Sequence, residues 1–166
     1  MPWLTRNGHL APVVRSQLPG EALDVLDRVL DALDGDAAAL AAKARGSSRV
    51  DFIVEPPGVV VEYDEVQHFT TARLKTLALY PTTAQLGFDV NEYVALVRRW
   101  ASRGDRAFAH KEAAEFPGRA GRQRQRAYFD ALRDLVAPHF DNGPLIRIPS
   151  PANDYAAAVA RLRSLV

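Results

Sequence analysis

Residues 49–69 read RVDFIVEPPGVVVEYDEVQHF and give the clearest indication of the fold. Two runs of β-branched and aromatic residues, 50–54 and 59–63, flank a Pro-Pro-Gly sequence, which predicts two neighbouring strands of a hairpin. Neither run alternates cleanly with polar residues, so at least one strand is expected to be covered on both faces, as central strands of α/β sheets are. The second run nevertheless ends in polar residues: Glu62, Asp64, Glu65, Gln67 and His68.

Helical patterns surround this hairpin. Apolar residues recur at helical spacing over 20–34, and the Ala-rich stretch 36–45 has high helix propensity, with Asp36 as its N-cap and Gly46 as its stop. The remaining expected elements are an irregular arm or a short strand at 12–15, helices over 70–80, 89–103 and 122–136, a loop or a short helix with a loop over 104–121, a strand over 144–148 and a closing helix over 155–165. This order predicts an α/β protein in which helices flank a small mixed β-sheet.

Length and composition favour a single domain, residues 1–166, with 48% hydrophobic and 25% charged residues. The absence of cysteine excludes disulfides, thiolate metal sites and a cysteine nucleophile. The chain start shows no signal-peptide pattern and no apolar run is long enough to span a bilayer, so we expect a cytoplasmic protein. Net charge is only +1, but the segment 98–126 holds nine basic residues against three acidic ones.

The acidic end of the second strand suggests a cation site. Glu62 and Asp64 share one face of the strand, and Asp51 lies on its neighbour, although the register cannot be counted from sequence. Two carboxylates about 4 Å apart repel by roughly 4 kcal/mol at an effective dielectric near 20, so a cation, a raised pKa or a basic neighbour must compensate. Oxygen ligands favour Mg²⁺ or Mn²⁺. The alternative is that the strand simply reaches solvent there.

Two neighbouring polar residues extend this interpretation. His68 is either a structural histidine or a base or ligand of the acidic cluster. Gln67 is expected either to orient a water molecule or phosphate, or to cap the following helix.

The quoted stretch resembles the active-site hairpin of the PD-(D/E)XK nuclease superfamily, most of all its very short patch repair (Vsr-like) branch. The matching residues are Asp51, Glu62, Asp64 and His68. The later segment RQRAYFDALRDLVAPHFDNGPLIRIP is similar to the helix and last core strand of that family, with Arg147 where an arginine is usual. The resemblance covers about 18–69 and 120–165, which leaves about 70–119 as a helical insertion.

This resemblance implies a restriction-endonuclease-like fold and a metal-dependent endonuclease acting on DNA. Asp51 and Glu62 would bind Mg²⁺, Asp64 would share in metal or water binding, and His68 would act as a base or phosphate ligand. Glu21 in the first helix is a possible additional acid, and Asp24 would serve as well.

The sequence departs from the family pattern at two positions. Glu65 stands where glycine is usual, and Asp64 stands where a lysine is usual, so positive charge would come from Arg73 or Lys75, or not at all. A retained fold without activity, binding nucleic acid or protein, is therefore the alternative function. A third possibility is an interaction protein with 70–119 as its docking surface.

The stretch GRAGRQRQRAY is expected to track phosphates, since arginines supply much of the non-specific affinity for nucleic acid. DNA is the expected partner, with a homodimer or a protein partner as further possibilities. The expected nucleic-acid-binding residues are Arg73, Arg119, Arg122, Arg124 and Arg126.

Overall fold

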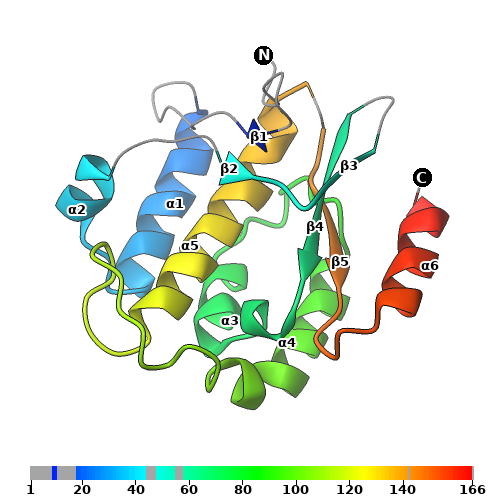
Figure 1. The fold of residues 1–166 in the computed structure, drawn as a ribbon. Helices are drawn as coiled ribbons and strands as arrows, with labels where there is room; N and C mark the ends of the chain where they lie inside the picture. The colour runs from blue at the N-terminus through cyan, green and yellow to red at the C-terminus, as the bar shows by residue number, and fades with distance from the viewer. Residues whose placement is uncertain (1–8, 11–17, 44–47, 55–57, 142, 166) are drawn as a thin grey trace.

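The computed structural model describes residues 9–10, 18–43, 48–54, 58–141 and 143–165. Its elements follow the predicted order and confirm a mixed α/β protein (Figure 1). They are β1 (His9–Leu10), α1 (Gly20–Ala32), α2 (Ala37–Ala42), β2 (Ser48–Arg49), β3 (Phe52–Val54), β4 (Val59–Asp64), η2 (Val66–His68), α3 (Thr71–Leu77), α4 (Val90–Gly104), α5 (Gly121–Val136), η3 (Ala137–His139), β5 (Ile146–Pro149) and α6 (Tyr155–Leu165).

The main sheet has three strands in the order β3-β4-β5. β3 runs antiparallel to β4 with Phe52 opposite Val61, which confirms the predicted hairpin. β5 returns through α5 and pairs in parallel with β4, with Arg147 opposite Glu62. The sheet is therefore mixed, and its central strand β4 carries the acidic end. β1 and β2 form a separate two-stranded ladder.

Some expected features differ or lie outside the described residues. The Ala-rich helix ends at Ala42 instead of continuing to residue 45, although Asp36 caps it as predicted, since its side chain accepts a hydrogen bond from the Ala39 backbone N at 3.0 Å. The helix expected over 70–80 ends at Leu77. The strand expected at 12–15 and the stop at Gly46 lie outside the described residues.

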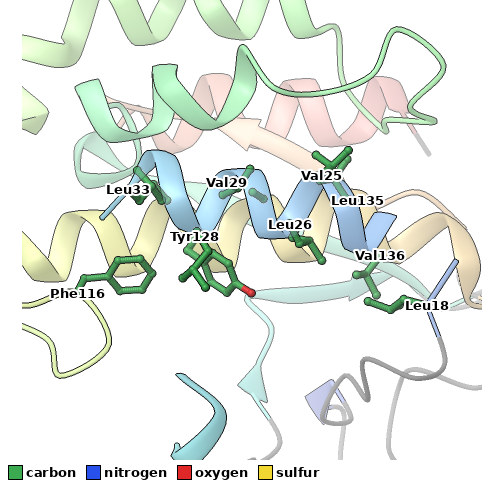
Figure 2. Packing of buried hydrophobic residues seen from close by; sticks show 12 residues of the cluster. Leu18, Val25, Leu26, Val29, Leu33, Phe116, Tyr128, Leu135 and Val136 are labelled. Atoms are coloured by element: carbon green, nitrogen blue, oxygen red, sulfur yellow. The ribbon is translucent and has the colours of Figure 1, made fainter. Parts of the chain in front are cut away.

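Helices cover both faces of the sheet (Figure 1). α5 packs on one face and carries α1 on its outer side, while α6 lies against the other face next to β5. Buried leucines, valines and aromatic residues fill the space between α1 and α5, as Figure 2 shows for Leu26, Val29 and Tyr128. Burying side chains of this size, at about 1.5–3 kcal/mol each, accounts for a large part of the folding free energy. No helix in the described part of the chain is long and apolar enough to cross a membrane.

The interface between the sheet and α5 changes character along its length. At the start of β4, Val60 packs with Leu145, the residue before β5, and with Ala137 in an apolar cluster. At the end of β4, buried Glu62 and Asp64 share the same face, next to buried Arg147. The acidic strand end therefore does not reach solvent: it lies under α5, within the core.

Candidate functional site

Asp64 lies at the centre of a buried ionic network. Its side chain is fully buried, and its Oδ1 accepts a hydrogen bond from Arg147 Nη1 at 2.8 Å. Its Oδ2 accepts another from the Tyr93 hydroxyl of α4 at 2.7 Å. Burial raises the pKa of the Tyr93 hydroxyl well above its ordinary value, so this group stays a donor. Both oxygens of Asp64 are thus satisfied by the protein itself.

Two aspartates of α5 complete the charge balance around the buried arginines. Arg147 Nε donates to Asp134 Oδ1 at 2.7 Å, and Arg73 of α3 donates through Nη2 to Asp134 Oδ2 at 2.5 Å. The Tyr80 hydroxyl donates to the same Oδ2 at 2.7 Å. Arg147 Nη2 also lies 3.4 Å from Asp130 Oδ1. Each buried charge here has an opposite charge within hydrogen-bond or ion-pair distance, as burial in a low dielectric requires.

His68 and Asp130 form a pair at the edge of this network. His68 Nδ1 lies 2.8 Å from Asp130 Oδ2 and 3.4 Å from Asp64 Oδ1, and its side chain is 13% exposed. Burial acts to lower the pKa of His68, but the carboxylates of Asp130 and Asp64 raise it by more, so the net shift is upward. In turn, burial acts against ionisation of Asp130, but His68 and Arg147 hold its pKa well below the usual range. The two carboxylates therefore stabilise the imidazolium form of His68 relative to that of a free histidine.

Glu62 differs from Asp64 because one of its oxygens has no donor. Oε2 accepts a hydrogen bond from Arg133 Nη1 of α5 at 2.6 Å. Oε1 is buried and has no hydrogen-bond partner among the residues that the structure describes. Burial raises the pKa of Glu62 to about 7, because loss of solvation outweighs the attraction of Arg133 and Arg147. The nearby charges of Asp130 and Asp51 raise it further.

Asp51 is exposed and lies just before β3. Its Oδ2 accepts a hydrogen bond from the Tyr63 backbone N at 2.8 Å, which fixes the side chain against β4. Extending the hairpin register by one residue from the Phe52 and Val61 pair places Asp51 opposite Glu62. Asp51 and Glu62 are therefore neighbours across the hairpin, one exposed and the other buried.

The structure does not bring the three predicted metal ligands together. Within the described part of the chain, no group of three or more acidic or histidine side chains is placed to hold a metal ion. The physical reason is the commitment of Asp64 to Arg147 and Tyr93, which takes both its oxygens. In this arrangement both oxygens of Asp64 are engaged by protein groups, whereas Glu62 Oε1 has no hydrogen-bond partner among the described residues.

Several other predicted site residues have protein partners. Gln67 Nε2 donates to Glu65 Oε2 at 2.8 Å. This hydrogen bond accounts for the position of the Gln67 side chain without a role as a helix cap or a water ligand. Glu21 is exposed and its Oε1 accepts from the Thr83 hydroxyl at 3.5 Å, against the connection between α3 and α4.

The predicted nucleic-acid-binding arginines divide into two groups. Arg73 is fully buried in the ionic network, and Arg124 donates to the backbone oxygens of Leu33 and Pro117, so both have structural partners in place of a phosphate. Arg119 and Arg122 are exposed, and Arg126 is partly exposed.

Sequence reasoning missed the acids that organise the network, Asp130 and Asp134. They lie four residues apart on α5 and therefore share a face, which turns inward beside the apolar stripe of that helix. A second signal was Arg147 between Ile146 and Ile148 in an otherwise apolar strand. A buried arginine requires a buried acid, and these two aspartates lie on the facing helix.

A family model described as a family of unknown function matches residues 28–165. The chain belongs to this family, DUF7255. No curated protein and no solved structure matches the chain. The part matched to DUF7255 contains the hairpin, α3 to α5 and β5, and so includes the whole ionic network together with Asp51 and Glu62, whereas Glu21 lies before it.

The raised pKa of Glu62 predicts a specific pH dependence of stability. The folded chain holds a proton on Glu62 up to a pH of about 7, whereas the unfolded chain releases it near the ordinary value of 4.5. The unfolded state binds fewer protons in this window, so stability falls as the pH rises from about 5 to 7. Glu62→Gln removes this effect, and we expect it to recover up to about 3 kcal/mol of unfolding free energy above pH 7 relative to wild type.

Urea denaturation of both chains at a series of pH values measures this difference. The wild-type and variant stabilities should converge toward pH 5 and separate at higher pH. A difference that stays constant across the series would show that Glu62 is ionised throughout.

Proposed function

We propose that the chain is a divalent-metal-dependent endonuclease that hydrolyses phosphodiester bonds in DNA, with Asp51 and Glu62 as the metal ligands. The observation that carries the proposal is Glu62 Oε1, a buried carboxylate oxygen to which no described residue donates, next to the carboxylate of Asp51. A buried carboxylate oxygen without a donor is stabilised when the acid keeps its proton or when that oxygen binds a cation.

Two carboxylates fit the requirements of Mg²⁺ or Mn²⁺. Mg²⁺ keeps several waters and is commonly held by one or two carboxylates together with phosphate oxygens of the substrate. When bound, the ion would polarise the phosphate and lower the pKa of a bound water. Arg133, on Oε2 of Glu62, fixes the carboxylate so that Oε1 keeps its direction.

His68 is the second chemical group of the proposed site. Its Nδ1 is held by Asp130, which leaves Nε2 as the nitrogen that exchanges a proton with substrate. Because the carboxylates raise its pKa, the ring suits the role of cationic phosphate ligand or proton donor to the leaving oxygen better than that of a base. Asp130 is a positioning residue for this ring.

The element order supports a restriction-endonuclease-like fold as part of the same proposal. A helix, an antiparallel hairpin with acids at its open end, a crossover helix and a parallel strand follow each other in α1, β3, β4, α5 and β5. A cytoplasmic location fits the absence of cysteine from the sequence.

A second candidate function is a module of the same fold that binds nucleic acid or protein without cleaving it. It is favoured by one observation: the acid two residues after Glu62 is Asp64, and Asp64 is fully occupied by Arg147 and Tyr93. In that case the network is purely structural.

A cleavage assay separates the two candidates. Purified protein is incubated with single-stranded and double-stranded DNA in Mg²⁺, in Mn²⁺ and in chelator. We expect metal-dependent cleavage that Asp51→Asn lowers by at least roughly 100-fold, since even groups outside the ligand sphere of a metal commonly contribute 10–100-fold. Glu92→Gln, which changes an exposed acid on α4, serves as the control. Equal activity in wild type and Asp51→Asn would contradict the proposal.

A further inference from the structure

Phe108 occupies an unusual backbone conformation in the segment between α4 and α5. Its φ is 58°, in the left-handed region that bulky residues rarely adopt. The segment is held in place by buried Gln123 of α5, whose Nε2 lies 3.2, 2.7 and 2.6 Å from the backbone oxygens of Gly104, Asp105 and Ala107. The strained residue is therefore fixed by the surrounding structure, a situation common at binding sites.

The ring of Phe108 is partly exposed and lies among cations. It stands outside the four hydrophobic clusters that the described residues form. Lys111 Nζ lies 4.6 Å from the ring centroid, and Arg126 Cζ lies 5.9 Å from it. An aromatic ring flanked by two cations offers one group that stacks on a base and two that bind phosphate.

Arg126 also has an unused donor. Its Nη1 is buried without a hydrogen-bond partner among the described residues. Neighbouring Arg122 adds a second positive charge on the same helix, one turn earlier, and is exposed. The Asp130 and Glu65 carboxylates are close enough to act on Arg126 electrostatically, yet no hydrogen bond to either satisfies Nη1. A phosphate oxygen is an acceptor of suitable charge for this donor.

We propose that Phe108, Arg126 and Lys111 form a binding site for an unpaired nucleotide of single-stranded nucleic acid, with the base stacked on Phe108 and the phosphate held by the two cations. The site deepens the proposed function, on which it rests for the choice of ligand, by naming the substrate class. A base inside a duplex is already stacked on both faces, so only an unpaired base can stack on this ring, where it takes the place of a cation that lies over the ring in the free protein and then binds the phosphate.

Arg126 lies on the same helix as the residues that contact His68 and Glu62. Arg126 precedes Asp130, the partner of His68, by one turn of α5, and precedes Arg133, the partner of Glu62, by two turns. Seven residues of helix span about 10 Å. A strand with about 3.4 Å per nucleotide along its axis would cover that distance in about three steps. The base on Phe108 would therefore lie a few nucleotides from the phosphate at Glu62.

Fluorescence anisotropy with a labelled oligothymidylate, in chelator, tests the site without any cleavage. We expect Phe108→Leu to weaken binding by roughly 5- to 150-fold, the range of one stacked base, and Phe108→Trp to restore it. Phe52→Leu is the matched control, because Phe52 is 52% exposed on β3, and it should bind like wild type. Arg126→Gln should reduce the slope of log affinity against log salt by about 0.7.

Two results would overturn the site. One is equal binding by Phe108→Leu and Phe52→Leu, with Arg126→Gln keeping the wild-type salt slope. The other is tighter binding of a duplex of the same length than of the single strand. Thermal melts establish that each variant is folded, and the oligoribonucleotide of the same sequence distinguishes RNA from DNA. Because the chelator removes divalent metal from this assay, it measures binding alone. A failure of the proposed nucleotide site is therefore distinguishable from a failure of metal-dependent cleavage at Asp51 and Glu62.

Discussion

Arg147→Met is expected to lower the free energy of unfolding by about 3–5 kcal/mol, the usual cost of leaving buried charges without their partner. Arg147 is buried and donates to Asp64 Oδ1 and Asp134 Oδ1, at 2.8 and 2.7 Å. Methionine has a similar length and no charge, so the change removes the cation and keeps most of the volume. Since a small domain has roughly 5–15 kcal/mol of stability in total, much of the variant population is expected to be unfolded on mild heating.

Urea denaturation with Arg161→Met as the control measures this effect. Arg161 is on α6 with a side chain 42% exposed, and it forms a long ion pair with exposed Glu92 at 3.9 Å, so its replacement should change stability by less than about 1 kcal/mol. If Arg147→Met is as stable as Arg161→Met, the network does not stabilise the fold. Asp64→Asn, which keeps the shape of the side chain and removes its charge, should show a smaller loss in the same direction.

The sequence predicts the hairpin and most helices well because their signals are local. The β-branched runs around Pro-Pro-Gly identify β3 and β4, and apolar residues at helical spacing identify α1, α4 and α5 to within a residue or two at most ends. Helix ends without a strong stop are less well predicted. The segment 70–80 is expected to be helical throughout, but α3 ends at Leu77.

The surroundings of the acidic strand end could not be predicted in the same way. Asp64 meets Arg147, which is 83 residues away in the sequence, and Tyr93, which is 29 residues away. Such contacts depend on how helices and strands pack, and no local period records them. Three kinds of compensation were expected from the charges alone: a cation, a raised pKa or a basic neighbour. Asp64 has the basic neighbour, whereas Glu62 has both a basic neighbour and a raised pKa.

The candidate site is therefore smaller than the sequence suggested. The pattern of acids predicted Asp51, Glu62 and Asp64 as one group, because strand alternation puts Glu62 and Asp64 on one face. Glu62 and Asp64 do share one face of β4, but helix α5 covers that face. Asp130 and Asp134 of α5 bind Arg147, the residue that neutralises Asp64. Asp51 and Glu62, at the edge of the hairpin, are the two acids that remain for binding a cation.

Cation binding by Asp51 and Glu62 has the largest expected effect on function. A divalent ion at Glu62 Oε1 must displace the proton that the raised pKa retains, so Mn²⁺ affinity is expected to increase as the pH rises through about 7. The same linkage predicts that Mn²⁺ opposes the loss of stability at higher pH, since a ligand bound only to the folded state stabilises it. Glu62→Gln should abolish both effects together, while remaining folded.

Isothermal titration of the chain with Mn²⁺ near pH 7.5 tests the central claim most directly. Wild type should bind one ion per chain, and both Glu62→Gln and Asp51→Asn should weaken this binding by at least roughly 100-fold, the upper end of what loss of an outer partner of a metal costs. Glu92→Gln, which removes an exposed acid with 69% side-chain exposure on α4, should bind as wild type does. The absence of a binding heat from wild type, or equal affinity in wild type and Glu62→Gln, would contradict the claim that this pair is a metal site.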